Sequence, residues 1–320
     1  MNNGIPDWRQ VLREHPTCAG DRRAVLKIIL KTKDENFLLQ DWIDHHARIV
    51  GFENLLVLDN LSTDPEVLGI YKRYAAAMPI GSFDGFVDNP HTRSLFAPLY
   101  AWLAETTAFY SLLDTDERLV WVEDGVFFDD SRIVETLSHL PAASALPGTW
   151  LYNQPGSKTR FGFGAKGGLA DGLRWGKPVI SASANRPNTV VHNLQAASMF
   201  DHPVTNFFVL HLSRLSAIQR VKANANKLRS YSVISNEDGL DAIAKIDLAS
   251  IKTPALVRLV EETRKLSKLG EYPKTNDAAT PDSILFRDGR IEFHDADQKR
   301  LLQEFIAQSA EFLAGCYQMA

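Results

Sequence analysis

The chain has 320 residues, of which 45% are hydrophobic and 10% aromatic, so it can bury a full core in one large domain or two modest ones. This composition excludes a disordered or fibrous protein. The net charge of −4 argues against general nucleic-acid binding, which usually shows as a basic excess.

The sequence carries no sign of export or membrane insertion. Its first residues lack the charged-then-apolar layout of a secretory signal, and its longest apolar runs are far too short to span a bilayer. The two cysteines, Cys18 and Cys316, form neither a metal-binding spacing nor a disulfide framework. We therefore expect a soluble, cytoplasmic protein.

Strand-like and helix-like segments alternate from Ala24 to about Val134. Apolar runs predict a strand that ends just before Asp114 and three earlier strands, at 24–31, 53–59 and 80–87. Helical periodicity and capping signals predict helices at 36–50, from Pro65 onward behind an Asp64 cap, and at 94–107. This alternation predicts an α/β fold, with a mostly parallel sheet flanked by helices on both faces.

Residues 141–203 are dense in Gly, Pro, Asn and aromatic residues, which is typical of loops and short strands that carry function. Within them Gly162, Gly164 and Gly167 satisfy the G-x-G-x-x-G pattern. A dinucleotide-binding turn needs a strand before this pattern and a helix after it, and the flanking sequence predicts neither. The pattern therefore favours a flexible Gly-rich loop.

The last third of the chain changes character again. An apolar strand at 206–213 is followed by charged helical segments, a hairpin about Asp288–Gly289 and a last helix that begins near Ala296. We expect a first domain at 22–215 and a mainly helical C-terminal extension at 216–320 that packs on it.

Three acids, Asp114, Asp116 and Glu117, come directly after an apolar strand. In open parallel sheets ligands bind beyond the carboxyl ends of the strands, so we expect these acids at a crevice. A D-x-D pair on extended backbone projects two carboxylates close together, as a Mg²⁺ or Mn²⁺ ion shared with a diphosphate requires. The alternative is a solvated acidic turn, because a bare D-x-D is common.

The ends of the first two strands also carry acids. Asp59 ends the second strand, where a carboxylate can accept hydrogen bonds from a ribose or a base edge. Turn chemistry is the alternative there. Lys31, Lys33, Asp34 and Glu35 end the first strand, at a place that often holds a nucleotide, and a lysine there can neutralise phosphate charge. Taken alone, they are more typical of a solvated loop at a helix start.

Four histidines and one arginine complete the candidate residues. His45 and His46 are adjacent on a predicted helix and point about 100° apart, which favours packing over metal binding. His192 and His211 end or interrupt apolar runs, as core histidines do, although a metal ligand remote from the D-x-D pair is chemically reasonable. Arg214 precedes a basic helix and could bind a diphosphate bidentately.

The order of these motifs resembles glycosyltransferases with the GT-A fold, and specifically their family-2 and family-92-like group. That group opens with a strand, a Lys-Asn-Glu turn, a helix carrying EWIEHH and a strand ending DNxSTD, and residues 27–64 are similar. The D-x-D stretch resembles the group's AFxDxDEF segment, and 188–193 and 211–214 resemble its later histidine segments. The chain departs from the group at Asp34, where Asn is usual, and at Arg118, where an aromatic is usual.

The resemblance implies a GT-A-like, Rossmann-like sheet and a transferase that uses a nucleotide-sugar donor with Mn²⁺ or Mg²⁺. Asp114 would lie near the ribose and the metal, and Asp116 would ligate the metal. His211, or less readily His192, would complete the metal site.

The same resemblance implies that Asp59 and the Lys33–Glu35 turn line the nucleoside. An inverting transfer also needs a general base for the acceptor hydroxyl. The candidate bases are Glu237, Asp238 and Asp171.

The acceptor class would be a glycan or a glycolipid, as in polysaccharide or glycolipid biosynthesis, and a lipid-linked acceptor would be met peripherally at the membrane. Two other functions fit a related sheet. A nucleotidyltransferase would usually show a Gly-rich, basic loop after the first strand, and the stretch TKDENF contains no glycine. A non-catalytic sugar- or partner-binding module on a degenerate transferase scaffold is the other alternative.

Overall fold

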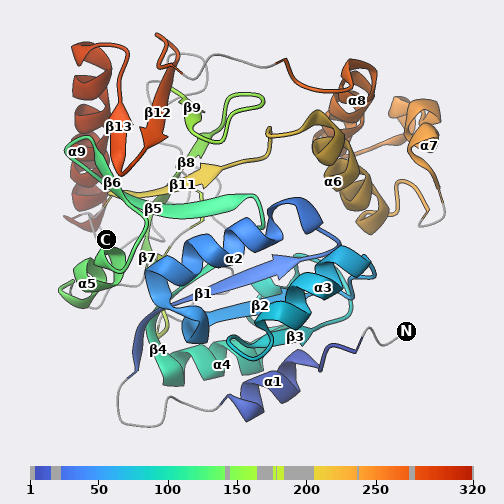
Figure 1. Cartoon of the computed structure of the whole chain (residues 1–320), viewed down its shortest axis with the longest axis horizontal. Coiled ribbons are helices and arrows are strands. Elements are labelled where there is room, and N and C mark those ends of the chain that lie inside the picture. The colour runs from blue at the N-terminus through green and yellow to red at the C-terminus, as the bar shows by residue number, and fades with distance from the viewer. Residues whose placement is uncertain are drawn as a thin grey trace.

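The computed structural model describes residues 4–15, 23–140, 145–163, 176–177, 179–183, 205–235, 238–273 and 278–318. A six-stranded sheet forms its first layer (Figure 1). Four parallel strands come first in its order, β3 (Ile80–Ser82), β2 (Leu55–Asp59), β1 (Ala24–Thr32) and β4 (Thr107–Leu113). Two antiparallel strands extend it beyond β4, β10 (Val179–Ser181) and β7 (Ala145–Leu146).

Helices cover both faces of this sheet, as the alternation of segments predicts. One face carries α2 (Asn36–Val50) and α3 (Pro65–Tyr74), and the other carries α1 (Trp8–Glu14) and α4 (Ala97–Thr106). Ile28 of β1 belongs to the core on the α2 face, whereas its neighbour Ile29 belongs to the core on the α4 face. Successive side chains of a strand point to opposite faces, so a strand buried on both faces reads as one continuous apolar run. The predicted α/β fold is confirmed.

A second, seven-stranded sheet lies beside the first and is mostly antiparallel. Its order is β8 (Gly148–Tyr152), β11 (Phe207–His211), β5 (Glu117–Glu123), β6 (Val126–Phe128), β13 (Arg290–Glu292), β12 (Ser283–Arg287) and β9 (Arg160–Gly162). Only β8 and β11 pair in parallel. The helices α5 (Arg132–Ser138) and α9 (Ala296–Gln318) accompany it. The alternation of strands and helices did not predict this second sheet.

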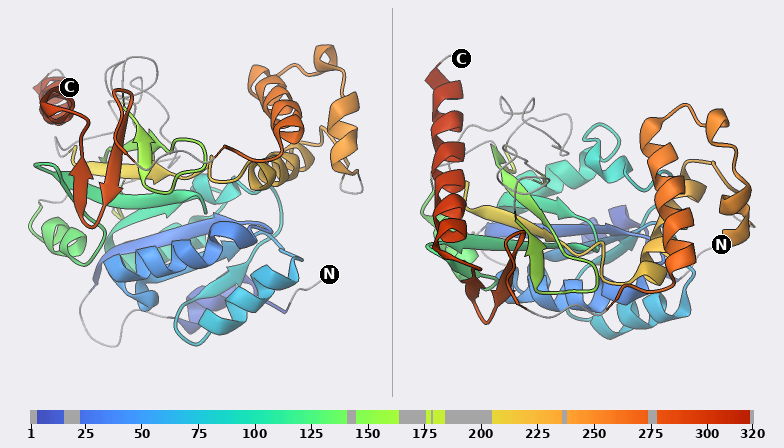
Figure 2. Two further views of the ribbon diagram at one scale, coloured as in Figure 1. Left: turned by 45° about the horizontal axis from the view of Figure 1, so that its top comes forward. Right: turned by 90° about the horizontal axis from the view of Figure 1, so that it is seen from above.

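The C-terminal region divides into two parts. Residues 217–269 form α6 (Ala217–Ser230), α7 (Leu240–Lys245) and α8 (Pro254–Leu269), which have an apolar core of their own. The predicted hairpin about Asp288–Gly289 and the helix after it instead return to the second sheet. Figure 2 shows α6–α8 at one end of the sheets and α9 at the other. Three short 3₁₀ helices, Phe52–Asn54, Asn89–His91 and Leu248–Ser250, complete the described elements.

Among the described helices, none is long and apolar enough to cross a bilayer.

Helix α2 is attached to the backbone of β5 by two histidines. The Nε2 atom of His45 lies 2.9 Å from the carbonyl oxygen of Leu119, and the Leu119 N–H donates to Nε2 of His46 over 3.2 Å. Nδ1 of His46 then donates to the carbonyl oxygen of Trp42. The hydrogen bond that His46 accepts on Nε2 needs a neutral ring, and burial lowers the pKa of His45 to about 4 and that of His46 well below its ordinary value. Both histidines therefore have the packing role that their adjacency indicates.

Because His45 is buried and neutral in the fold, the folded protein should lose stability in mild acid. The pKa is 6.5 in the unfolded chain and about 4 in the fold, so the unfolded state takes up the proton first as the pH falls. We expect the free energy of unfolding to drop by about 2 kcal/mol from this group between about pH 7 and about pH 5. Urea unfolding over that range should show a shallower drop for His45→Gln.

Equal pH dependence in the wild type and His45→Gln would contradict this assignment.

Candidate functional site

The D-x-D turn joins β4 to β5 at the carboxyl edge of the parallel strands. Glu117 fixes its shape: Oε2 accepts the Asp114 N–H over 2.7 Å, and Oε1 accepts Nε1–H of Trp150 over 3.1 Å. Glu117 is fully buried, and burial raises the pKa of its carboxyl. The third acid of the cluster therefore positions the turn, and Asp114 and Asp116 are left to face the crevice.

The contacts of Arg118 explain why an arginine, and not an aromatic residue, follows the acids in this chain. Its guanidinium is buried and donates to the carbonyl oxygens of Thr115, Glu117 and Leu38, over 2.8, 3.0 and 3.2 Å. Nη2 also donates to Oδ2 of Asp41 over 2.7 Å. An aromatic ring could only pack here, whereas the arginine ties the turn to α2 with directed hydrogen bonds.

Two buried lysines hold the carboxylate of Asp114. Nζ of Lys31 lies 2.5 Å from Oδ1 and 2.7 Å from Asp88, and Nζ of Lys177 lies 3.1 Å from Oδ2. Lys177 also contacts Nε2 of His91 at 3.2 Å. Burial alone would raise the pKa of Asp114, but Lys177 and then Lys31 hold it well below its ordinary value. Asp114 is thus a permanent anion whose charge is already balanced.

The sequence predicts Lys31 as a candidate phosphate partner at the end of the first strand, but not its pairing with Asp114. Sequence reasoning missed Lys177, because its partner Asp114 lies 63 residues away.

Asp116 faces His211, the last residue of β11. The two atoms Oδ2 of Asp116 and Nδ1 of His211 are 3.5 Å apart. That Nδ1 atom is buried and makes no hydrogen bond with any residue the structure describes. Burial lowers the pKa of His211, against the opposing charge of Asp116, so the neutral ring is favoured. When the ring proton is on Nε2, Nδ1 offers a lone pair beside a carboxylate, which is the donor set that a transition-metal ion accepts.

A divalent cation fits this pair but finds no complete set of protein ligands. Within the described ranges, no three His, Cys, Asp or Glu side chains converge closely enough to hold a metal. Asp114 points its oxygens at Lys31 and Lys177 instead. The described residues therefore offer two candidate ligands, Asp116 and His211, and the other coordination positions would fall to water, to a bound anion or to residues outside the described ranges such as His192.

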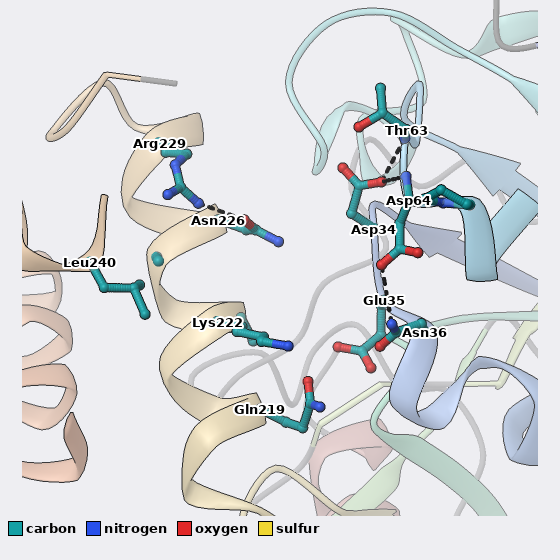
Figure 3. Close-up of a pocket in the computed structure, with 13 residues that line it drawn as sticks. Asp34, Glu35, Asn36, Thr63, Asp64, Gln219, Lys222, Asn226, Arg229 and Leu240 are labelled. Carbon is teal, nitrogen blue, oxygen red and sulfur yellow. Dashed lines mark hydrogen bonds between the residues drawn. The ribbon is translucent and has the colours of Figure 1, made fainter. Parts of the chain in front are cut away.

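A polar cavity of about 570 Å³ lies between α6 and the loops that follow β1 and β2 (Figure 3). Gln219, Lys222 and Asn226 project from α6 toward the loop that carries Asp34 and Glu35. A smaller hollow of about 40 Å³ shares Glu35 and Gln219 with the cavity and reaches Asp116. The cavity therefore continues to the metal-binding candidates.

Asp34 connects the two loops of this wall. Its Oδ1 atom accepts the N–H groups of Thr63 and Asp64 over 2.6 and 2.8 Å, and its own N–H donates to Ser62. Asp34 has a φ of +47°, a conformation that Asn and Asp adopt more readily than other side chains. This geometry suits Asp as well as the usual Asn, because both adopt this φ and both offer an accepting oxygen.

Glu35 caps α2 by accepting the N–H groups of Phe37 and Leu38 over 3.1 and 3.2 Å. Burial, and then the charge of Asp116, raise the pKa of its carboxyl. Lys33 is exposed on the same loop. The Lys33–Glu35 turn thus lies at the cavity, with Glu35 nearest to the D-x-D turn.

Asp59 is fully buried. Its Oδ1 atom accepts the hydroxyl of Tyr71 over 2.9 Å, and its Oδ2 atom accepts the Ser62 N–H over 2.8 Å. These contacts are the turn chemistry that the sequence leaves open as the alternative to nucleoside binding.

The remaining candidates are spread more widely. Arg214 is exposed, and its guanidinium lies over the ring of Tyr152, 5.9 Å from the centroid, while that ring also packs against His211. Asp238 lies in the loop between α6 and α7, where Oδ2 accepts the Ser235 N–H. Glu237, Asp171 and His192 fall outside the described residues.

No family model matches the sequence, and no curated protein matches it. Among solved structures, residues 1–349 of TarS from S. aureus align with a TM-score of 0.33 and 11% identity, over 85% of this chain and 99% of that chain. The mannosyltransferase PcManGT from Pyrobaculum calidifontis, solved with GDP-Man and Mn²⁺, gives 0.32 and 10%, over 83% of each chain. An inositol-1-phosphate CTP transferase from T. maritima gives 0.25 and 10%, over 76% of this chain and 97% of that chain. At these scores the likenesses carry no argument, and function rests on the geometry of the site.

Replacing Arg118 should loosen the D-x-D turn and the fold together. Arg118→Met keeps the apolar stem but leaves three buried carbonyl oxygens without their donor, at a cost of about 3 kcal/mol in the free energy of unfolding. Urea denaturation measures this loss. The matched change Arg132→Met removes an exposed arginine that pairs with Asp130, and it should cost much less. Equal losses in the two variants would show that Arg118 is not a structural tie.

Proposed function

We propose that the chain is a GT-A-type glycosyltransferase that moves a sugar from a nucleotide-sugar donor to a hydroxyl acceptor with the help of Mn²⁺ or Mg²⁺. The observation that carries this proposal is the Asp116–His211 pair. It lies at the carboxyl edge of a parallel sheet, where such folds bind ligands, and its buried Nδ1 atom lacks a hydrogen-bond partner among the described residues.

Asp116 and His211 would hold the cation, and a bound divalent ion would offset the charge that develops on the leaving diphosphate. Lys31 and Lys177 lie at the neighbouring Asp114 and place two more positive charges beside the diphosphate position. Asp114 orients both ammonium groups, and the ribose of the donor would lie beside Asp114. In this scheme Arg214 reaches the diphosphate from the far side of His211.

The nucleoside would occupy the polar cavity, whose wall includes Asp34 and Glu35. Lys33 is placed to approach a bound phosphate from solvent. Asp59 acts on the nucleoside indirectly, because its oxygens shape the loop that carries Ser62 and Thr63.

An inverting outcome requires a base that takes the proton from the acceptor hydroxyl. We retain Glu237, Asp238 and Asp171 as the candidates for this base. The reaction would take place in the cytoplasm on a glycan or glycolipid acceptor.

Divalent cation and donor should stabilise the protein together. In a thermal-shift panel of nucleotide sugars, we expect at least one donor to raise the melting temperature, and Mn²⁺ to enlarge that increase. Asp116→Asn keeps the shape of the side chain but removes the charge, so it should abolish the Mn²⁺-dependent part. Asp130→Asn, a surface acid that pairs with Arg132, is the matched control and should respond as the wild type does.

A panel in which no donor shifts the wild type would refute the proposal, as would an Asp116→Asn variant with an undiminished Mn²⁺ response. Product analysis identifies the reaction. A glycosyltransferase releases a nucleoside diphosphate from the donor, a nucleotidyltransferase releases or consumes pyrophosphate, and a binding module releases neither.

A further inference from the structure

A second cavity, of about 640 Å³, lies among the three helices α6, α7 and α8. Its volume falls in the range of about 300–1,000 Å³ that small-molecule sites occupy. Aliphatic side chains from all three helices line it: Ile218, Val221, Leu240, Ile243 and Leu266. We call this cavity the helical groove.

The mouth of the helical groove is unusually apolar for a surface. Ile218 and Leu240 in its lining are 49% and 45% exposed. Two large apolar side chains at one opening, beyond a core that α6–α8 already share, are a surface that a ligand or partner would bury.

The charges around the groove are mainly positive. Lys222, Arg264 and Lys268 line it with a single acid, Asp241, which pairs with Lys245 at 3.4 Å. Arg264 is committed to the carbonyl oxygens that end α7. The side chains of Lys222 and Lys268 make no hydrogen bond or ion pair within the part of the chain that the structure describes. Their two ammonium groups are therefore available to bind an anion at the groove.

The helical groove adjoins the polar cavity of the candidate site. Lys222 and Leu240 line both. In Figure 3 Lys222 projects from α6 toward the Asp34–Asn36 loop, whereas Leu240 lies on the other flank of the helix. An apolar compartment, a cation and a polar compartment therefore follow one another across a single helix.

From this arrangement we propose that the helical groove receives the aliphatic chain of an anionic lipid acceptor drawn from a membrane surface, with its phosphate at Lys222. The inference rests on the proposed glycosyl transfer and names its acceptor class. An anionic amphiphile uses the apolar compartment and the cation at its edge, whereas a partner helix would need only the apolar compartment. Exposed aliphatic side chains with neighbouring lysines also suit binding at an anionic bilayer surface.

Vesicle co-sedimentation tests the proposal. The full chain should bind phosphatidylcholine vesicles that contain phosphatidylglycerol several-fold better than vesicles of phosphatidylcholine alone. The double change Ile218→Ser and Leu240→Ser should lower this binding about fivefold or more, because it removes apolar surface at the mouth. Leu301→Ser with Phe312→Ser, two exposed apolar residues of α9, is the matched control and should bind as the wild type does.

A short-chain phosphatidic acid, held below its micelle-forming concentration, separates the groove from mere adsorption to a bilayer. It should raise the melting temperature of the wild type but not that of Lys222→Gln. Vesicle binding without this stabilisation would overturn the proposal, as would equal losses in the α6–α8 and α9 variants. A wild-type dimer that becomes a monomer in the Ile218→Ser and Leu240→Ser variant would assign the groove to a second copy of the chain instead.

Failure of this inference and failure of the proposed function give different results. A wild type that responds to Mn²⁺ and a nucleotide sugar but ignores both lipids remains a transferase with another acceptor. A wild type that binds lipid in the groove but no nucleotide sugar is not a glycosyltransferase, and the acceptor role falls with it.

Discussion

The buried guanidinium of Arg118 is the constraint on which the site depends. It follows directly on the D-x-D turn, and its hydrogen bonds join that turn to the carbonyl of Leu38 and the carboxylate of Asp41 on α2. His45 and His46 attach the same helix to β5 one residue further along. Because β4 belongs to the first sheet and β5 to the second, these contacts set both sheets relative to α2. A turn held this firmly can present carboxylates at fixed positions before any ligand arrives.

The two aspartates of the turn have separate electrostatic roles. Asp114 lies between two buried lysines, which keep it ionised and are themselves held in place by it. Asp116 has instead a neutral imidazole nearby, with an unused nitrogen. A carboxylate already neutralised by ammonium groups is a poor metal ligand, whereas one beside a free nitrogen lone pair is a good one. The D-x-D pair therefore combines one carboxylate that holds cationic side chains with one that would be left to ligate a cation in the proposed function.

Helix α6 connects this centre to the C-terminal helices. Its first turns border the hollow that reaches Asp116, its polar face lines the cavity above Asp34, and residues of the same helix line the helical groove. Tyr231, which follows its last turn, packs against Phe86 in the loop after β3. The helices α6–α8 thus border the candidate site. The apolar and cationic character of their groove would therefore influence which acceptor the proposed enzyme binds.

The sequence by itself determined the features whose causes are local. The bounds of α2 follow from its apolar period, the Glu35 cap and Gly51, and the parallel strands follow from continuous apolar runs that end in acids. Only the tertiary structure decided which acids pair with buried cationic side chains. Lys177 meets Asp114 across 63 residues and Arg118 meets Asp41 across 77, and the second sheet arises from pairings of short, distant strands. Such contacts depend on how elements pack, and packing leaves no periodic trace near either partner.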